Sequence, residues 1–160
     1  MLYEVTGNLL SGDYDVICHQ VNCQGIMGSG LASQIKFKYP DVYDSYCNIV
    51  DYNKQTGHQS KYLLGENDIC YCQNDDCIVI NMFAQDYYGT DKTHTDYTAF
   101  RKCLIRLKAY LDCKAENLKV AFPYKIGCGL AGGDWNIIKA MIESFAEHVA
   151  QPVYIVRLPE

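Results

Sequence analysis

The chain has 160 residues, of which 49% are apolar and 21% are charged, and its formal net charge is −5. These values predict one soluble globular domain over residues 1–160. No apolar run approaches the length of a membrane span, and the N-terminus lacks the pattern of a secretory signal, so we expect a cytoplasmic protein with no membrane contact. No basic stripe is visible, which argues against extended DNA or RNA as a partner.

Nine cysteines are an unusually high number for such a chain. The number is odd and several cysteines lie in apolar, strand-like runs, so we interpret them as reduced, mostly buried thiols. Two groups provide side chains for a zinc site as the alternative: Cys18, His19 and Cys23, and Cys70, Cys72 and Cys77. No C-x-x-C pair is present, and we expect neither a metal nor a cofactor.

The apolar pattern changes repeatedly between the strand period and the helix period. Strand-like runs cover Leu2–Thr6, Asp15–Gln20, Asp68–Cys72, Cys77–Met82, Leu118–Pro123 and Val153–Leu158. Helical spacing covers a segment from about Leu31 until Pro40 stops it, a short segment Val42–Tyr52, and the segments Tyr97–Leu111 and Trp135–Val149. This order predicts a three-layer α/β domain with a mixed, mostly parallel sheet and helices on both faces.

Two glycine clusters each follow a predicted strand and precede a predicted helix: "CHQVNCQGIMGSGLASQ", residues 18–34, and "FPYKIGCGLAGGDW", residues 122–135. A helix N-terminus offers unpaired N–H groups and partial positive charge, and glycine lets an anion approach the backbone closely. Since ligands of such sheets bind beyond the carboxyl ends of strands, the two loops predict a clamp for a diphosphate. Two tight turns packed against neighbouring backbone are the alternative.

The two standard glycine motifs do not fit. There is no G-K-[S/T] of a P-loop, and Ser33 stands where the third glycine of G-x-G-x-x-G would be.

Four stretches in this order resemble the macrodomain family: "HQVNCQGIMGSGLASQI" with "KYPDVY", "NMFAQ", "TDYTAF" and "IGCGLAGGDW". The resemblance covers nearly the whole chain from "YEVTGNLL" onward. It is nearest to the branch that includes the terminal ADP-ribose protein glycohydrolase and the macrodomain of chromatin-remodelling helicases. It implies a six-stranded mixed sheet between helices, and a cleft for ADP-ribose, either free or attached to protein or nucleic acid. A monomer is the expected state.

The resemblance also implies which residues contact ADP-ribose: Asn8, Leu9, Asn22, Gly25, Met27, Gly28, Ser29, Gly30, Phe83, Gln85, Ile126, Gly127, Cys128, Gly129, Leu130 and Ala131. The position of Asn8 usually holds an aspartate that contacts the adenine amino group. An asparagine can offer its carbonyl oxygen to the same N–H, but without negative charge. Phe83 and Tyr87 can stack on ribose or adenine, although buried packing is the commoner role of such aromatic residues.

The glycohydrolase in this branch uses a lysine near the end of the strand written here "IVINMF", and an aspartate directly after Gly-Cys-Gly-Leu. This chain has no lysine between Cys77 and Thr90, and Ala131 follows Leu130. Both catalytic groups are therefore missing at the matching positions, which argues against a lysine-adduct mechanism.

Other side chains near the two loops are candidates for catalysis. Asp134 can act as the general base for a water at the distal ribose, or only as the N-cap of the helix that follows it. Asn22 and His19 are candidate ribose contacts, although His19 at a strand end can equally be a structural residue. Cys128 lies near a positive helix end, which would lower its pKa, but no paired histidine is evident to activate it.

Two functions agree with these residues. The first, which we favour, is a hydrolase acting at C1″ of ADP-ribose derivatives such as ADP-ribose 1″-phosphate, O-acetyl-ADP-ribose, or ADP-ribosyl groups on protein or nucleic acid. The second is a binding module for ADP-ribose without chemistry, which the missing lysine and aspartate favour. A nucleotide-binding α/β protein outside the family is a more distant alternative.

Overall fold

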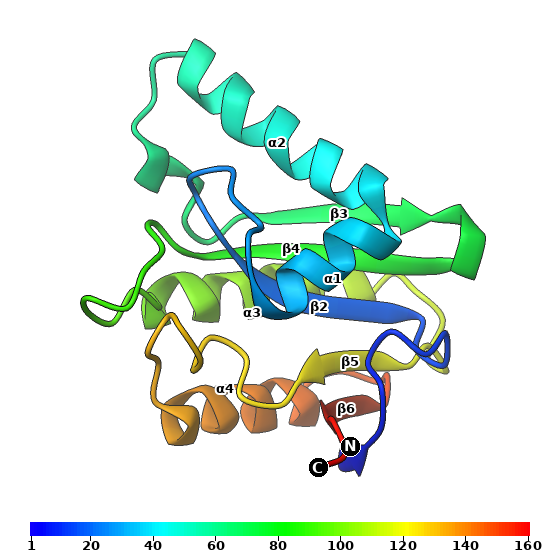
Figure 1. Ribbon diagram of the computed structural model, residues 1–160. Helices are drawn as coiled ribbons and strands as arrows, with labels where there is room; N and C mark the ends of the chain where they lie inside the picture. Colours follow the sequence, from blue (N-terminus) through cyan, green and yellow to red (C-terminus); the bar gives the residue numbers. More distant parts are fainter.

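Six strands form one sheet in the order β1-β6-β5-β2-β4-β3, which lies between two layers of helices (Figure 1). The structure is a computed structural model that describes residues 1–160. The strands are β1 (Leu2–Thr6), β2 (Val16–Asn22), β3 (Asn67–Cys72), β4 (Cys77–Gln85), β5 (Val120–Pro123) and β6 (Val153–Arg157). All neighbouring strands are parallel except β3 and β4, which are antiparallel. The predicted mixed, mostly parallel sheet is confirmed.

Four α-helices cover the sheet: α1 (Gly30–Lys38), α2 (Pro40–Gln55), α3 (Tyr97–Leu111) and α4 (Trp135–Glu147). Two short 3-10 helices, η1 (Ser60–Leu63) and η2 (Gln73–Asp75), flank β3. Every predicted strand and helix is present in the predicted order, but three strands are longer than predicted, β3 by the single residue Asn67. Strands β2 and β4 continue to Asn22 and Gln85, because their ladder holds them together as far as that pair of residues.

A single proline ends one helix and begins the next. Helix α1 ends at Lys38, as predicted, and Pro40 opens α2, where the missing N–H of proline would have no helical partner anyway. The prediction of a short helix over Val42–Tyr52 is wrong in length, because α2 starts at the proline itself and continues to Gln55. Only Tyr39 separates the two helices.

Alternate residues of the central strands pack against opposite layers of helices. Cys18 of β2 belongs to a core cluster with Phe100 of α3 and Ile142 of α4. Its neighbour Ile17 belongs to a second cluster with Ile35 of α1. Both faces of the sheet are therefore buried, which explains the nearly continuous apolar runs of the parallel strands.

The cysteines lie mainly inside these clusters. All nine are free thiols and six are buried, so the prediction of mostly buried thiols is confirmed. Because adjacent strand residues face opposite sides of the sheet, Cys18 and His19 cannot converge on one metal ion. No three His, Cys, Asp or Glu side chains in the molecule are placed to hold one.

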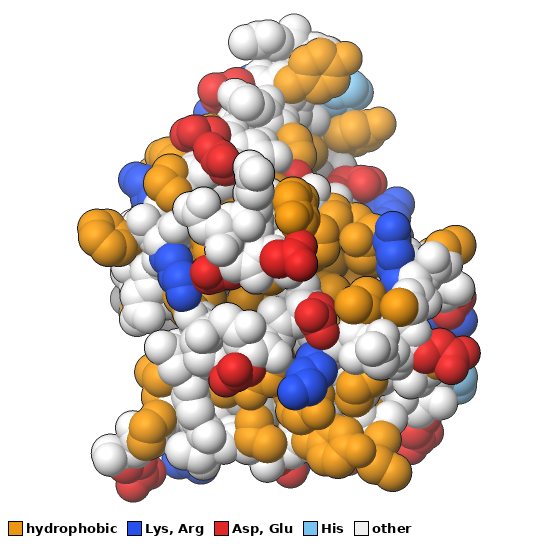
Figure 2. All heavy atoms as spheres, turned by 90° about the vertical axis from the view of Figure 1, so that its right-hand side faces the viewer, with side chains coloured by type: hydrophobic (Ala, Val, Ile, Leu, Met, Phe, Trp, Pro, Cys, Tyr) orange, Lys and Arg blue, Asp and Glu red, His pale blue; other side chains and the backbone are white.

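The surface offers no sign of an interface for a polyanion on the face shown in Figure 2. Acidic, basic and hydrophobic side chains are mixed there, and no continuous basic stripe is visible. None of the helices is long and apolar enough to cross a membrane.

Candidate functional site

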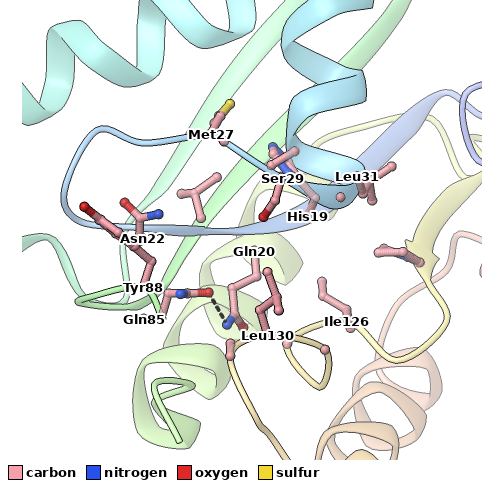
Figure 3. Close-up of a pocket in the computed structure, with 18 of the residues that line it drawn as sticks. His19, Gln20, Asn22, Met27, Ser29, Leu31, Gln85, Tyr88, Ile126 and Leu130 are labelled. Carbon is pink, nitrogen blue, oxygen red and sulfur yellow. Dashed lines mark hydrogen bonds between the residues drawn. The ribbon is translucent and has the colours of Figure 1, made fainter. Parts of the chain in front are cut away.

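A cleft of about 530 Å³ lies beyond the carboxyl ends of β2, β4 and β5, at the edge where both glycine loops meet (Figure 3). The two loops thus face one cavity, as the diphosphate clamp requires. The residues that line the cleft and were predicted as ligand contacts are Asn22, Met27, Gly28, Ser29, Gly30, Gln85, Ile126, Gly127, Gly129, Leu130 and Ala131, together with His19. Of the predicted residues that do not line it, Gly25 belongs to the first loop and Cys128 to the second.

The first glycine loop is held by a buried tyrosine of helix α2. The Tyr46 hydroxyl accepts hydrogen bonds from the backbone N–H groups of Gly25 (3.0 Å) and Ile26 (3.1 Å). It lies 2.7 Å from both the backbone oxygen and the side-chain oxygen of Asn22, to which it can donate its proton. Burial raises the pKa of Tyr46, so the hydroxyl keeps that proton. A glycine is needed at position 25, where φ is +85°.

Most of the hydrogen-bonding capacity of the Asn22 side chain is used within the same loop. Its side-chain oxygen accepts from the N–H of Gln24 at 3.0 Å, and its amide donates to the Ile26 oxygen at 2.8 Å. Asn22 is 7% exposed. One amide proton is left for the predicted ribose contact.

The second glycine loop is held by close backbone packing. Gly127 has φ +73°, and a Cβ there would lie 2.7 Å from the Gln20 side-chain oxygen. The Gly127 oxygen accepts from the N–H of Gly133 at 2.9 Å and from the Thr95 hydroxyl. A Cβ on Gly133 would lie 2.5 Å from that same oxygen. Gly133 therefore requires glycine for lack of space against the backbone, and Gly127 requires it chiefly for its left-handed conformation.

The bottom of the cleft contains a histidine that is shielded from solvent. His19 is 2% exposed, and its Nε2 is hydrogen-bonded to the side-chain oxygen of Asn81. Burial lowers the pKa of His19 to about 4, although the bond to Asn81 opposes this shift. The imidazole is therefore neutral at physiological pH.

The cleft carries one ionic side chain. Lys125 is the only Lys, Arg, Asp or Glu among the lining residues, and it directly follows Tyr124 at the end of β5. Its backbone has φ +58°, a left-handed conformation that non-glycine residues rarely adopt. Such outliers concentrate at binding sites. Together with the N–H groups of the loops, Lys125 makes the cleft suited to an anion.

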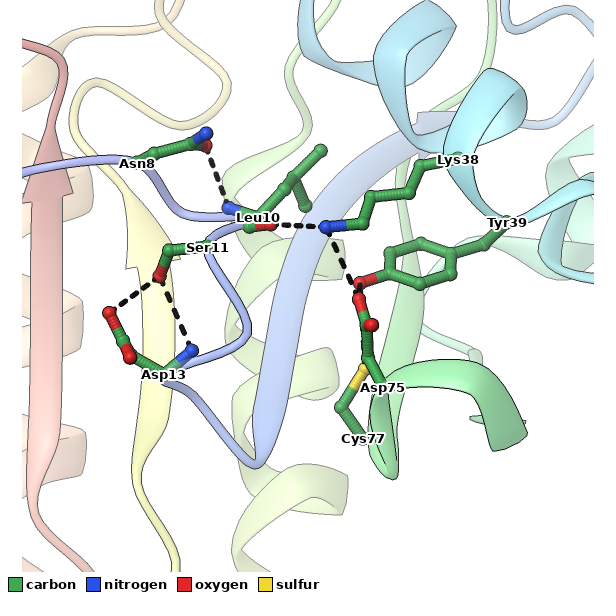
Figure 4. A network of polar contacts seen from close by, with 8 residues as sticks. All are labelled: Asn8, Leu10, Ser11, Asp13, Lys38, Tyr39, Asp75 and Cys77. Atoms are coloured by element: carbon green, nitrogen blue, oxygen red, sulfur yellow. Dashed lines mark hydrogen bonds and ion pairs between the residues drawn. The ribbon is translucent and has the colours of Figure 1, made fainter.

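Asn8 and Leu9 lie outside the lining of this cleft. The Asn8 side-chain oxygen, predicted to meet adenine, accepts from the N–H of Leu10 at 2.9 Å (Figure 4). Leu9 is 5% exposed and packs in the core cluster below α1. The Lys38 ammonium donates to the Leu10 oxygen and pairs with Asp75 at 3.2 Å, which fixes the loop after β1 to the turn between β3 and β4.

Phe83 is fully buried and packs on Tyr46 with ring centroids 5.6 Å apart, so it does not line the cleft. Of its two expected roles, stacking on ribose or adenine and buried packing, Phe83 has the packing role. The residue that faces the cleft after β4 is Tyr88, beside Gln85.

Cys128 also lies outside the cleft lining, and its thiol bonds to the Ile126 oxygen at 3.3 Å. Burial raises the pKa of Cys128 to about 11, and the nearby Asp134 contributes to the rise. The expected lowering of this pKa by a helix end is therefore wrong, because desolvation and a carboxylate outweigh it.

Asp134 is the N-cap of helix α4. It accepts a hydrogen bond from the N–H of Asn136 at 2.9 Å, and its own N–H donates to the Tyr97 hydroxyl. Its carboxylate is exposed and outside the lining of the cleft. The capping role is thus present, while the role of general base stays a prediction.

Several residues that shape the site were not among the predicted site residues. Gln20 donates to Gln85 and to Thr95, both at 2.9 Å, and so joins β2 to β4 and to the start of α3. In the sequence, Tyr46 is one of several apolar positions of the predicted helix Val42–Tyr52 and has nothing to set it apart. Lys125 could have been noted as the single cation within the second glycine stretch.

Comparisons with known proteins agree on one family. The model of the Macro domain matches residues 18–142. A 17.5 kDa protein from the tk-vs intergenic region of Enterobacteria phage T4 is 25% identical over 81% of this chain and 79% of its own length. The ADP-ribose 1″-phosphate phosphatase of Saccharomyces cerevisiae is 23% identical over 94% of this chain and 96% of its own.

A DNA ADP-ribosyl transferase–DNA ADP-ribosyl glycohydrolase fusion protein of Thermosipho africanus is 23% identical over 94% of this chain, which spans 40% of that protein. Among solved structures, the macrodomain of Mycobacterium tuberculosis DarG superposes with a TM-score of 0.78 and 22% identity, covering 100% of this chain and 99% of that one. This likeness extends over the whole fold described above.

Proposed function

The chain belongs to the Macro domain family, and from that premise we propose that its cleft binds ADP-ribose and acts on ADP-ribose derivatives at C1″. The observation that carries the binding proposal is the meeting of two glycine loops at one cavity that contains a lysine and no carboxylate. Backbone N–H groups at a helix N-terminus and a lysine together complement a diphosphate. The relatives named for ADP-ribose chemistry support this choice of ligand.

The ends of the cleft have different chemistry, which gives the ligand a direction. Pro123, Tyr124 and Leu31 form a mainly apolar end, where we place the adenosine. Asn22, Gln85 and Tyr88 form a polar end, where we place the distal ribose and its C1″ substituent. The loops containing Gly28 and Gly129 lie between, on the diphosphate.

Hydrolysis at C1″ needs a group that activates water, and two arrangements can supply it. Asp134 would have to release its cap and turn toward the cleft to act as a base. Alternatively, side chains at the polar end only orient the water: the bond between C1″ and the leaving oxygen breaks with its electron pair going to the departing group, and that departing anion accepts the proton of the attacking water. A phosphate or a carboxylate leaving group suits the second arrangement, because each departs as a stable anion.

A binding module without catalysis is the second candidate. The observation that favours it is the absence of any Asp or Glu from the cleft lining. A cleft without a base can still hold ADP-ribose by the contacts proposed above.

Calorimetric titration with ADP-ribose, AMP and NAD tests the choice of ligand. We expect ADP-ribose to bind more tightly than the other two, because only it presents a free distal ribose beyond the diphosphate. A Gly129→Leu variant is the matched blocking change, since a Cβ at this position meets no atom within 4 Å and φ is ordinary there. It should fold normally and lose the heat of binding. Equal affinities for the three ligands would contradict the proposal.

Incubation with ADP-ribose 1″-phosphate, glutamate-linked ADP-ribosyl protein and ADP-ribosylated DNA, with detection of free ADP-ribose, separates the hydrolase from the binding module. Asp134→Asn is the informative variant, because asparagine caps a helix as well as aspartate but cannot accept the proton. If that variant retains turnover and thermal stability, the general-base role of Asp134 is wrong. Binding without turnover of any substrate would establish the module.

A further inference from the structure

Three buried polar side chains form a row across three neighbouring strands. His19 of β2 is the register partner of Asn81 of β4, and Asn81 is the register partner of Asp68 of β3. Their exposed fractions are 2%, 0% and 6%. Burying polar groups costs free energy, so the row calls for an explanation.

The adjacent row on the same face is apolar, which indicates that the fold itself does not need polar residues here. Two positions back along the strands, Ile17 pairs with Val79, and Val79 pairs with Cys70. These three pack together under α1 and α2. The polar row differs in one respect: its inner end, His19, lines the cleft.

The hydrogen bonds of the row have a fixed direction. The Asn81 amide nitrogen donates to the Asp68 carboxylate at 3.0 Å and to the Val42 oxygen at 3.4 Å, and both of these groups accept there. The other oxygen of Asp68 accepts from the Ser45 hydroxyl at 3.0 Å. The amide of Asn81 is therefore oriented with its oxygen toward His19.

This orientation determines the tautomer of the histidine. Because an amide oxygen can only accept, Nε2 of His19 must carry the proton, and Nδ1 must be the bare acceptor nitrogen. Nδ1 has no hydrogen-bond partner among the side chains and backbone groups of the protein. It is also not fully enclosed, so another molecule can reach it. It is thus the atom that His19 can offer to a molecule in the cleft.

We propose that His19 accepts a hydrogen bond from a hydroxyl of the bound ligand through Nδ1, and that Asn81 is the positioning residue that holds His19 in the required tautomer. The inference rests on the proposed function, since ADP-ribose supplies ribose hydroxyls to donate. Asp68 and Ser45 orient Asn81 in turn. A ligand with phosphates alone has no donor for this nitrogen, so the contact adds selectivity for a sugar.

Nitrogen-15 NMR of the His19 ring in the wild-type protein tests the proposal without any substitution. We expect the Nε2–H tautomer in the free protein. Saturation with ADP-ribose should shift the Nδ1 resonance more than the Nε2 resonance. A free protein with the proton on Nδ1, or an Nδ1 resonance that does not move while amides of the glycine loops do, would overturn the proposal.

Two variants add a binding readout. Asn81→Leu removes the acceptor of Nε2 and should release the tautomer and weaken ADP-ribose binding about 3- to 10-fold, the effect of one hydrogen bond. Val79→Ala is the matched control in the apolar row, since it removes packing but leaves the imidazole alone. It should lower stability with affinity unchanged. Equal losses of affinity in both variants would mean that Asn81 acts only through stability.

The outcomes distinguish this inference from the proposed function. If ADP-ribose moves neither the loop amides nor the His19 ring, the proposed function fails and the ligand contact with it. If the loop amides respond and Nδ1 does not, ADP-ribose binding stands and only the role of His19 is wrong.

Discussion

The two glycine loops border the same cleft but are held in place by different means. The first loop is held by side chains, chiefly the Tyr46 hydroxyl with Asn22. The second is held by its own backbone, with Gly133 bonded to Gly127 and the Gln20 side chain packed where a Cβ would be. Glycine in the first loop mainly permits a conformation, whereas in the second it also makes room. The same residue type therefore predicts different responses to mutation.

The largest expected effect is in the second loop. Gly127→Ala should destabilise the protein by about 3 kcal/mol, combining a left-handed conformation with a clash against Gln20. Urea denaturation measures the loss. Gly129→Ala is the control in the same loop, because its Cβ would meet nothing within 4 Å, and it should change stability by less than about 0.5 kcal/mol. Equal losses would show that neither the backbone conformation nor the space at Gly127 is the cause.

Acid should lower the stability of the folded protein through His19, the buried histidine at the bottom of the cleft. Burial lowers the pKa of His19 to about 4, from 6.5 in the unfolded chain, so the unfolded state binds more protons between these values. Stability should be constant above pH 6.5 and fall as the pH drops toward 4, by up to about 3 kcal/mol. Thermal melts from pH 8 to pH 4 measure this. In His19→Phe the part of the slope due to this residue should vanish; an unchanged profile would show that other groups produce it.

The first loop should respond to loss of one oxygen atom. Tyr46→Phe leaves the N–H of Gly25 without its acceptor and the N–H of Ile26 with only the 3.5 Å contact to the Asn22 side-chain oxygen, at a cost of about 2 kcal/mol. Hydrogen exchange should accelerate at these two amides and not at Gly133. Tyr52→Phe on the same helix is the control, since Tyr52 is 69% exposed, and it should leave both stability and exchange unchanged.

The smallest effect concerns the charge of the cleft. Lys125→Gln should weaken ADP-ribose binding about 3- to 10-fold, and binding by the variant should depend less on salt. Lys61→Gln is the control for net charge, as Lys61 is exposed and outside the cleft. Lys125→Gly should weaken binding similarly while relieving the left-handed backbone. Retention of full affinity by both Lys125 variants would remove this lysine from the site.

Most of the architecture could be predicted from the sequence, since strand and helix periods alternate clearly and Pro40 marks a helix boundary. The meeting of the two glycine loops followed from parallel strands sharing one carboxyl edge. The boundaries of β2, β4 and α2 could not be predicted, because ladder partners and the position of the next element set them.

The roles of single residues were harder to predict. Asn22 and Phe83 lie close to where the resemblance places them, but their side chains are taken up by loop bonding and core packing. Which neighbour satisfies a polar group depends on residues distant in sequence, as with Tyr46 and Gly25. Asn81 is a polar residue within an apolar, strand-like run, but residue spacing alone does not show which groups it bonds to.

Tyr46 follows Asn22 by 24 positions in the sequence, and its hydroxyl contacts the Asn22 oxygen. The chain between them runs through the loop, α1, the single residue Tyr39 and the start of α2, and then returns to where it began. The hydrogen bonds of the Tyr46 hydroxyl therefore close this segment into a loop without any covalent bond. Such a closure lowers the conformational freedom of the chain between the two residues, so the backbone of the first glycine loop is held in place by a side chain that does not line the cleft.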